Sequence, residues 1–412
     1  MKSPSGMFSL RRLLFTMITA AVTAFCPIVP TAKASDLPSL PELSATGPEI
    51  MLIKSLQEIA ERRMDSALNG IEQLLQASPN FRLAHLIKGD LLLARTRPIS
   101  DMGETAGFSQ QHIADFREEA RVRVQRHREP APLDKTPKYL LQMQPDQKYA
   151  VIADTARSRL YLYQNVGNQP RYLADYYIST GKNGPQKLKE GDKKTPLGVY
   201  FVTASLPREQ LTDFYGGKAF PINYPNEWDK RHGRSGYGIW VHGTPSDTYS
   251  RAPRASDGCV VLSNQDLDRI STKLQVGITP VIISNEIEWV RPGDTMVLRD
   301  KLAQHLENWR RDWESGNIEA YLGNYGRDFS SGKQNLEQWS RHKRQVNAAK
   351  RWIKVGISNV GMFLYPGRDD LAVVVFHQEY ASNNLSNRMK KRQYWMKEPG
   401  NGSWKIIYES TA

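Results

Sequence analysis

The first patterned stretch of the chain carries apolar residues at helical spacing. Between residues 48 and 95 they recur every three or four positions, and Ser78-Pro79-Asn80 interrupts the series. Because positions three and four apart share one helix face, this spacing predicts a helical hairpin. A basic helical stretch at about residues 116–128 follows, and a proline-rich segment at residues 130–137 marks a linker.

Short runs of β-forming residues dominate the next part of the chain, separated by Gly, Asn and Pro. They are Tyr149–Ala153, Arg159–Tyr163, Tyr172–Ser179, Gly198–Thr203, Gly238–His242 and Pro280–Ser284. Runs of this length and composition are typical of strands. We therefore expect a mostly β domain at residues 147–285, after a helical region and linker at residues 35–146.

After Pro292 the pattern changes again. Amphipathic helices are predicted at about residues 298–315 and 318–322. Strand-like runs follow at residues 352–360, 371–380, 390–397 and 403–408. Helices followed by an antiparallel sheet predict a compact α+β domain at residues 293–412. The expected fold class is thus multidomain: α-helical, then mostly β, then α+β.

The N-terminus has the three parts of a secretory signal. Lys2, Arg11 and Arg12 precede an apolar run at residues 13–29, and Ala32-Lys33-Ala34 follows. We expect residues 1–34 to be a signal peptide that is removed on export to the periplasm or cell envelope. No later stretch is apolar enough to cross a bilayer, so no transmembrane segment is expected in the mature chain.

Charge narrows the expected partners. The chain has a formal net charge of +13, and loss of the signal peptide lowers it to +9. For an exported protein, a basic surface favours an acidic polymer or an anionic lipid surface over nucleic acid. The basic residues are spread along the chain, so a solvated cationic surface remains the alternative.

Cysteine usage draws attention to one residue. The two cysteines are Cys26 and Cys259, and Cys26 leaves with the signal peptide. Cys259 then has no internal disulfide partner. A lone thiol in an oxidising compartment is either a small buried core residue or a nucleophile.

A histidine and this cysteine frame one short segment. His242 ends a predicted strand, and Cys259 follows 17 residues later in Ser256-Asp257-Gly258-Cys259. A thiol attacks a carbonyl as thiolate, so we expect a nearby positive charge to lower the pKa of Cys259. Gly258 would let the backbone approach a substrate, with backbone N–H groups holding the oxyanion.

This segment resembles the signature of the YkuD-type L,D-transpeptidases, in which a histidine-glycine pair precedes a Ser-His-Gly-Cys stretch. An upstream block, Ser179-Thr180-Gly181-Lys182 followed by Glu190 to Tyr200 with its Thr195-Pro196-Leu197-Gly198 element, matches the same family in order and spacing. The resemblance covers about residues 147–285. It implies an enzyme that acts on peptide stems of peptidoglycan.

The resemblance assigns roles to individual residues. Cys259 is expected to be the nucleophile and His242 the base, its tautomer set by a carbonyl near Gly243. Gly258 and the Cys259 backbone would form the oxyanion hole. Asp257, beside Ser256 on the substrate side, stands where many members have a second histidine. Its negative charge would oppose thiolate formation unless it is turned away or paired.

Residues before the catalytic strand and within the loop are candidates for substrate binding. Asn223, Tyr224 and Trp228 are candidates for the cavity wall, and for Tyr224 and Trp228 packing in the core is the alternative. Arg251 and Arg254 lie between base and nucleophile, where either is suited to pair with a stem carboxylate. The alternative for both is a solvated loop charge.

The C-terminal domain resembles the cone-shaped fold of nuclear transport factors and SnoaL-type cyclases. Its position after the catalytic domain resembles a family branch that includes L,D-carboxypeptidases shaping helical bacteria. Transfer of the acyl group to an amine would be transpeptidation, and transfer to water carboxypeptidation. A non-catalytic peptidoglycan-binding scaffold is the third alternative.

The helical region before the β domain contains one possible repeat unit. In the helical region, Ala67 and Ala84 together with Leu75, Pro79 and Gly89 resemble one tetratricopeptide-type unit. One unit falls short of a stable array, so it is expected to pack on a neighbour or to serve as a docking arm. Both flanking regions are candidates for protein partners. The sequence has no His-Glu-x-x-His motif and no phosphate-binding glycine loop, so neither metal nor cofactor is expected.

Overall fold

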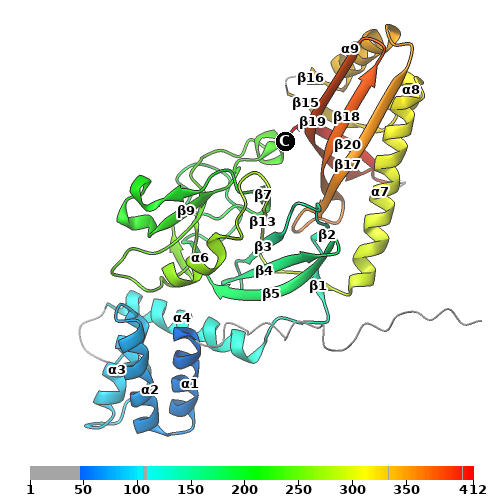
Figure 1. Cartoon of the computed structure of the whole chain (residues 1–412). Helices are drawn as coiled ribbons and strands as arrows, with labels where there is room; N and C mark the ends of the chain where they lie inside the picture. Colours follow the sequence, from blue (N-terminus) through cyan, green and yellow to red (C-terminus); the bar gives the residue numbers. More distant parts are fainter. Residues whose placement is uncertain (1–46, 105–108, 333, 401) are drawn as a thin grey trace, which may run out of the picture. The chain divides into compact units, whose positions relative to one another are not determined.

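The computed structural model confirms the predicted order of helices, a mostly β domain and an α+β domain (Figure 1). It describes residues 47–104, 109–332, 334–400 and 402–412. The predicted signal peptide, residues 1–34, lies outside these residues. Among the helices that the structure describes, none is long and apolar enough to cross a membrane.

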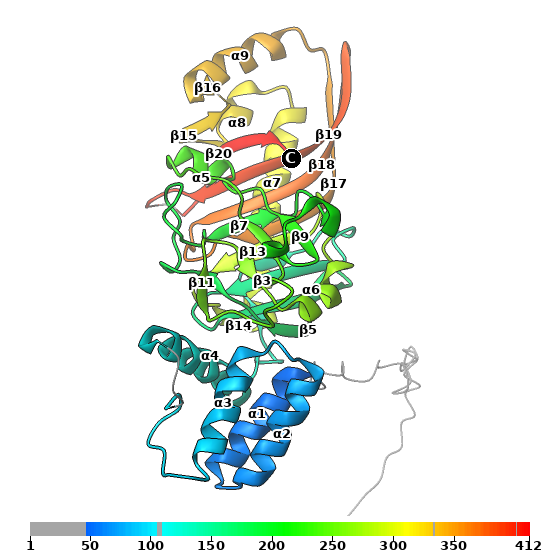
Figure 2. The same ribbon diagram turned by 90° about the vertical axis from the view of Figure 1, so that its left-hand side faces the viewer.

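The helical region contains α1 (Pro48–Ala60), α2 (Met64–Ala77), α3 (Arg82–Leu93) and α4 (Gln110–Arg128). In Figure 2, α1, α2 and α3 lie side by side, and α4 contacts both α1 and α3. The apolar positions that produced the predicted periodicity, such as Leu52, Ala67, Ile71 and Ala84, are fully buried between these helices. The interruption at residues 78–80 is the turn between α2 and α3.

Two larger sheets build most of the β domain, beside a two-stranded sheet of β6 (Thr180–Gly181) and β11 (Arg254–Ser256). The first has the strand order β5-β4-β3-β13-β7, and the second has the order β12-β10-β9-β8. The strand bounds are β3 (Tyr149–Asp154), β4 (Arg159–Val166), β5 (Gln169–Tyr177), β7 (Gly198–Phe201), β8 (Leu206–Pro207), β9 (Lys218–Pro221), β10 (Trp240–His242), β12 (Val260–Val261) and β13 (Pro280–Ser284). Apolar side chains from both sheets, including Val151, Val281, Val241 and Val260, form one core. Burial of this core fixes where the ends of β10 and β12 lie.

The C-terminal domain is a curved sheet covered by helices. Its strands are β15 (Tyr325–Ser331), β16 (Gln334–Asn335), β17 (Ile353–Leu364), β18 (Leu371–Ser382), β19 (Leu385–Lys397) and β20 (Trp404–Thr411), and its helices are α7 (Pro292–Glu314), α8 (Ile318–Leu322) and α9 (Leu336–Ala348). Helix α7 packs on β17, with Trp309 fully buried among Phe376 and other aromatic residues (Figure 1). The hydrophobic pattern did not predict β15, β16 or α9.

The linker does more than join two domains. Its strand β2 (Leu140–Gln142) pairs antiparallel with β17 and becomes an edge strand of the C-terminal sheet. A second short strand, β1 (Thr136–Pro137), pairs with β14 (Trp289–Val290), which follows the last strand of the β domain in the chain. Residues expected to be irregular linker therefore tie the β domain to the domain that follows it.

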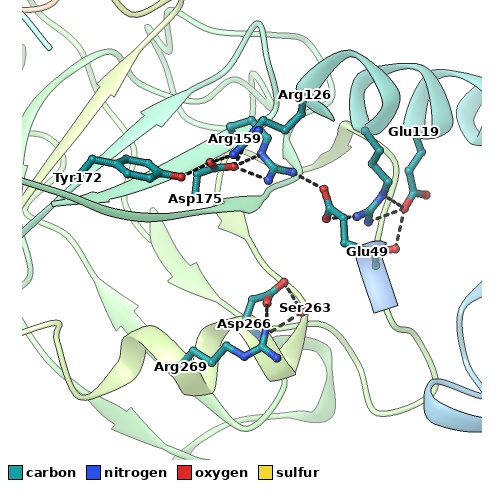
Figure 3. A network of polar contacts seen from close by, with 11 residues as sticks. Glu49, Glu119, Arg126, Arg159, Tyr172, Asp175, Ser263, Asp266 and Arg269 are labelled. Carbon is teal, nitrogen blue, oxygen red and sulfur yellow. Dashed lines mark hydrogen bonds and ion pairs between the residues drawn. The ribbon is translucent and has the colours of Figure 1, made fainter. Parts of the chain in front are cut away.

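Charged side chains join the helical region to the β domain. Glu49 at the start of α1 forms ion pairs of 2.6 Å with Arg123 of α4 and with Arg159 of β4 (Figure 3). Asp175 of β5 accepts hydrogen bonds from Arg159 at 2.8 Å and from Arg126 at 2.7 Å. These groups are largely shielded from water, so each charge depends on its partners. The helical region thus packs on a neighbouring domain, one of the two roles expected of a single helical unit.

Candidate active site

Strand pairing brings the predicted base and nucleophile onto one face. β10 and β12 run parallel, with His242 of β10 opposite Val261 of β12. Side chains alternate along extended backbone, so Cys259 projects from the same face as Val261. Paired residues of adjacent strands also share a face, which adds His242 to that face. The fold therefore gathers two residues that are 17 positions apart in the sequence.

A backbone carbonyl fixes the tautomer of His242. The Nδ1 atom lies 2.7 Å from the carbonyl oxygen of Gly243, the geometry that the sequence predicted. A carbonyl only accepts hydrogen bonds, so Nδ1 carries the proton and Nε2 keeps its lone pair. Burial, with a smaller contribution from the positive charge of Arg251, lowers the pKa of His242 to about 4. The ring is therefore neutral near pH 7 and able to accept a proton.

Cys259 rests as a neutral thiol. Its Sγ donates to the carbonyl oxygen of Gly238 at 3.3 Å and accepts a hydrogen bond from the backbone N–H of Trp240. Burial raises the pKa of Cys259 to about 11, although the Trp240 N–H and the charge of Arg251 oppose the rise. The expectation of a lowered pKa was wrong, because the neighbouring imidazole is itself neutral and supplies no charge.

The turn before Cys259 is closed by a serine hydroxyl. Ser256 Oγ accepts a hydrogen bond from the N–H of Gly258 at 3.1 Å and donates to the carbonyl oxygen of Cys259 at 2.7 Å. In this conformation the Gly258 N–H is already engaged, which differs from its expected role in an oxyanion hole. The backbone N–H of Cys259 remains the candidate for that role. Ser256 shapes the turn from within the protein and is buried.

The upstream motif that contains Thr195 stabilises the turn before Cys259. Thr195 Oγ1 donates to the carbonyl oxygen of Gly258 at 3.0 Å and accepts from the N–H of Gly181 at 2.8 Å. Gly258 has φ +128°, and a Cβ there would lie 2.7 Å from the carbonyl oxygen of Lys194. A side chain at position 258 would therefore be strained by its backbone conformation and would clash with the threonine-proline block.

The aspartate that departs from the family signature has a cationic partner. Asp257 Oδ1 lies 3.3 Å from Lys182 Nζ, and both side chains are exposed. We expected Asp257 to be turned away or paired, since its charge would otherwise oppose thiolate formation, and it is paired. Its charge still raises the pKa of Cys259, after the larger effect of burial.

Of the two loop arginines, Arg251 is the one beside the reacting groups. Its guanidinium lies 4.4 Å from the ring centre of Phe214, and that ring lies 6.2 Å from the ring of His242. Arg254 is exposed, and its charge acts on Glu118 of α4. The structure thus separates two arginines that were equal candidates from the sequence, and Arg254 has none of these contacts with the aromatic residues beside the base.

The other predicted wall residues have internal partners. Tyr224 is buried, and its hydroxyl donates to the carbonyl oxygen of Ser235. Trp228 is buried against His232, with ring centres 4.0 Å apart. Asn223 Oδ1 accepts from the N–H of Phe201 at 2.7 Å. For Tyr224 and Trp228 these contacts correspond to the packing alternative, because both side chains are buried against internal partners.

Aromatic side chains that the sequence did not single out surround the base. The ring of Tyr215 lies 5.1 Å from that of His242 and 4.7 Å from that of Trp240. Phe214 is about half exposed and packs on Tyr215. The adjacent aromatic pair Phe214-Tyr215 was the available signal, but no local pattern places it beside a histidine almost 30 residues later. Among the described residues, no group of three His, Cys, Asp or Glu side chains is arranged to hold a metal.

Similarity to known proteins falls on two segments of the chain. Residues 148–283 match the L,D-transpeptidase catalytic domain family named YkuD, and residues 301–410 match the Cds6 C-terminal NTF2-like domain. Over 114 residues the chain is 36% identical to the Escherichia coli K12 protein named "Putative L,D-transpeptidase YafK". This match covers 27% of the chain and 41% of the relative, so it spans less than half of that protein.

Two solved structures resemble a larger part of the chain. Bd1075 of Bdellovibrio bacteriovorus has a TM-score of 0.59 and 29% identity, covering 68% of this chain and 98% of that chain. The helical cell shape determining protein Pgp2 of Campylobacter jejuni has a TM-score of 0.56 and 26% identity, covering 66% of this chain and 95% of that chain. The chain contains an L,D-transpeptidase catalytic domain of the YkuD family, followed by an NTF2-like domain of the Cds6 C-terminal type.

Proposed function

We propose that this protein is an exported cysteine enzyme of the cell envelope that acts on tetrapeptide stems of peptidoglycan. It would cleave the bond between the L-centre of meso-diaminopimelate and the terminal D-alanine, and pass the acyl group to an amine as an L,D-transpeptidase. The observation that carries the proposal is the parallel pairing of β10, which ends at His242, with β12, which directly follows Cys259, together with the hold of Gly243 on Nδ1 of the histidine. No resident cofactor is part of the proposal.

The first half-reaction follows from this geometry. Rotation about the Cβ–Sγ bond would turn the thiol proton of Cys259 from the Gly238 carbonyl toward Nε2 of His242. As Sγ bonds to the carbonyl carbon, the proton would move to Nε2, and the backbone N–H of Cys259 would face the developing oxyanion. The imidazolium would then protonate the departing D-alanine amine and leave a thioester on Cys259.

The acceptor distinguishes the two enzyme activities. An incoming amine would give a cross-linked stem, and water would give a tripeptide. In either case His242 would accept the acceptor proton and return it to sulfur. Water is the second candidate, and the observation that favours it is similarity over 95% of the length of a protein whose name states a role in helical cell shape.

Product analysis on a defined substrate tests the proposal. The protein would be incubated with purified disaccharide-tetrapeptide, and the products followed by mass spectrometry. We expect D-alanine release that disappears in Cys259→Ala and in His242→Gln, whereas Ser205→Ala, an exposed serine in the same domain, serves as the matched control.

Each outcome has a distinct meaning. Cross-linked dimer with D-alanine would establish transpeptidation, and tripeptide with D-alanine would establish carboxypeptidation. No Cys259-dependent product would refute the enzymatic proposal and favour a scaffold that binds stems without cleaving them.

A further inference from the structure

The loop between base and nucleophile rests on the helical region. Asn80, in the turn before α3, donates from Nδ2 to the carbonyl oxygen of Ser246 at 2.9 Å. Its own carbonyl oxygen accepts from the N–H of Tyr249 at 3.1 Å. The rings of Phe81 and Tyr249 lie 4.3 Å apart. Three contacts from one turn of the helical region therefore hold residues 246–249.

Helix α4 holds the next residue of the loop through a buried carboxylate. Ser250 Oγ donates to Glu119 Oε1 at 2.7 Å, and the same oxygen accepts from Arg123 Nη2 at 2.9 Å. Glu119 and Arg123 are both buried. The cation of Arg123 also lies 3.7 Å from the ring centre of Tyr177. The hydroxyl of Tyr177 in turn donates to the carbonyl oxygen of Arg251 at 2.8 Å.

The last residue held by these contacts is Arg251, the loop arginine that lies near His242. The Arg251 guanidinium donates to the carbonyl oxygen of Phe214 at 3.1 Å and stacks on its ring. Its positive charge contributes to the lowered pKa of His242, and it opposes the larger rise that burial causes in the pKa of Cys259. A guanidinium that is half-buried beside a nucleophile is poised for a carboxylate, because Arg binds carboxylates through two parallel hydrogen bonds.

Helix α4, which contacts the loop, and helix α1 are held on the β domain by ion pairs. The Glu49 and Asp175 ion pairs shown in Figure 3 fasten α1 and α4 to β4 and β5. Removing one partner of such a buried pair would leave an uncompensated charge, so the arrangement resists local opening. The anchored helices therefore form a fixed surface against which residues 246–251 are held.

We propose that the helical region is a positioning element of the active site, holding residues 246–251 so that the Arg251 guanidinium binds the free carboxylate of the terminal D-alanine on the donor stem. This inference rests on the proposed function for the identity of the ligand. Asn80, Glu119 and Ser250 act through the loop as positioning residues. Arg251 is the residue that recognises the substrate.

Paired alkylating reagents test the charge at the site without relying on turnover. Iodoacetate carries a carboxylate and iodoacetamide does not, and the modified peptide containing Cys259 would be quantified by mass spectrometry. We expect Arg251→Gln to lower the ratio of the iodoacetate rate to the iodoacetamide rate about fivefold, through loss of one nearby positive charge. Arg171→Gln, at an exposed position on β5, is the matched control and should leave the ratio unchanged.

The same ratio tests the helical region. The double variant Asn80→Ala/Ser250→Ala removes both side-chain tethers and leaves Arg251 in place, and we expect it to lower the ratio about twofold or more. Adding Arg251→Gln to this variant should have less effect than it has in the wild type, because both changes act through one guanidinium. A ratio unaffected by the tether changes, in folded protein, would overturn the positioning role.

A comparison of two substrates tests recognition of the stem. For tetrapeptide with a free terminal carboxylate, Arg251→Gln should raise KM about tenfold or more with a smaller change in kcat, and Arg251→Lys should restore part of the affinity. For the corresponding terminal carboxamide, Arg251→Gln should change KM little. Equal losses on both substrates would refute carboxylate recognition. Absence of turnover in the wild type would refute the proposed function instead, while the alkylation ratio would still decide on the charge and its positioning.

Discussion

Replacing His242 by Gln should separate two properties that are often lost together, the reactivity of Cys259 toward small alkylating reagents and the turnover of substrate. Burial places the pKa of Cys259 at about 11 and that of His242 at about 4. The proton therefore resides on sulfur at rest, and the neutral imidazole contributes nothing to thiolate formation. His242 becomes important only when a substrate carbonyl draws the proton from sulfur.

These two values set the size of the effect. At pH 7 a thiol with a pKa of about 11 is thiolate in roughly one molecule in 10,000, compared with about 3% for a thiol of ordinary pKa. The deficit is about 300-fold, offset by roughly tenfold through the greater nucleophilicity of the more basic thiolate. Alkylation of Cys259 should thus be about 30-fold slower than that of an unperturbed thiol.

Iodoacetamide alkylation across a pH series measures this property. In the wild type the rate should climb about tenfold per pH unit from about pH 6 to 10 without a plateau. His242→Gln should follow the same curve, while D-alanine release falls by roughly 100- to 10,000-fold, the usual contribution of a general base. A small free thiol, which levels off above its own pKa, is the control.

A thiolate–imidazolium pair would give a different result. The wild-type rate would reach a plateau between the two pKa values near neutrality, and His242→Gln would abolish that plateau. Observation of such a plateau would refute the neutral resting state and the burial argument behind it.

Three further substitutions test the framework around the site by urea denaturation and turnover. Asp175→Asn should destabilise the fold by about 3–5 kcal/mol at pH 7, because it leaves buried arginines uncompensated. In the wild type these arginines hold the pKa of Asp175 below its usual range, although burial opposes the shift. The stability advantage of the wild type is therefore present above about pH 4 and is lost as the pH falls further. Thr195→Val should lower kcat/KM about 10- to 100-fold by freeing the turn at Gly258, whereas Thr195→Ser should not. Gly258→Ala should cost about 1–3 kcal/mol of stability and abolish turnover, unlike Gly217→Ala, where a Cβ meets nothing within 4 Å.

The secondary structure and the motifs depend on local sequence and could be predicted. Helical spacing indicated α1 to α3, and short β-forming runs indicated most strands of the β domain. The glycine, threonine-proline and cysteine motifs pointed to one domain through their resemblance to a family signature, and the structure shows that Thr195 contacts Gly258. The order of fold classes along the chain followed from these patterns.

Properties that arise from packing could not be predicted. A single aromatic residue such as Trp228 suits a core and a substrate wall equally, and only its neighbours decide. Arg251 and Arg254 are three positions apart, yet only the folded loop distinguishes them. The direction of the pKa shift of Cys259 depends on burial, which no local pattern encodes.

The pairing of β2 with β17 affects the order in which the chain folds during synthesis and the choice of fragments for expression. Gln142 of β2 donates to the carbonyl oxygen of Val360 across a separation of 218 residues. During synthesis, β2 emerges long before its partner, so the C-terminal sheet gains this strand only after the whole β domain has been translated. A fragment that begins at Pro292 would lose this pairing at Met362 and Phe363 and would leave backbone groups at that end of β17 unpaired, the kind of edge that favours association between chains. Including residues 140–142 in a fragment of the C-terminal domain, in the same chain or as an added peptide strand, would cover that end of the edge.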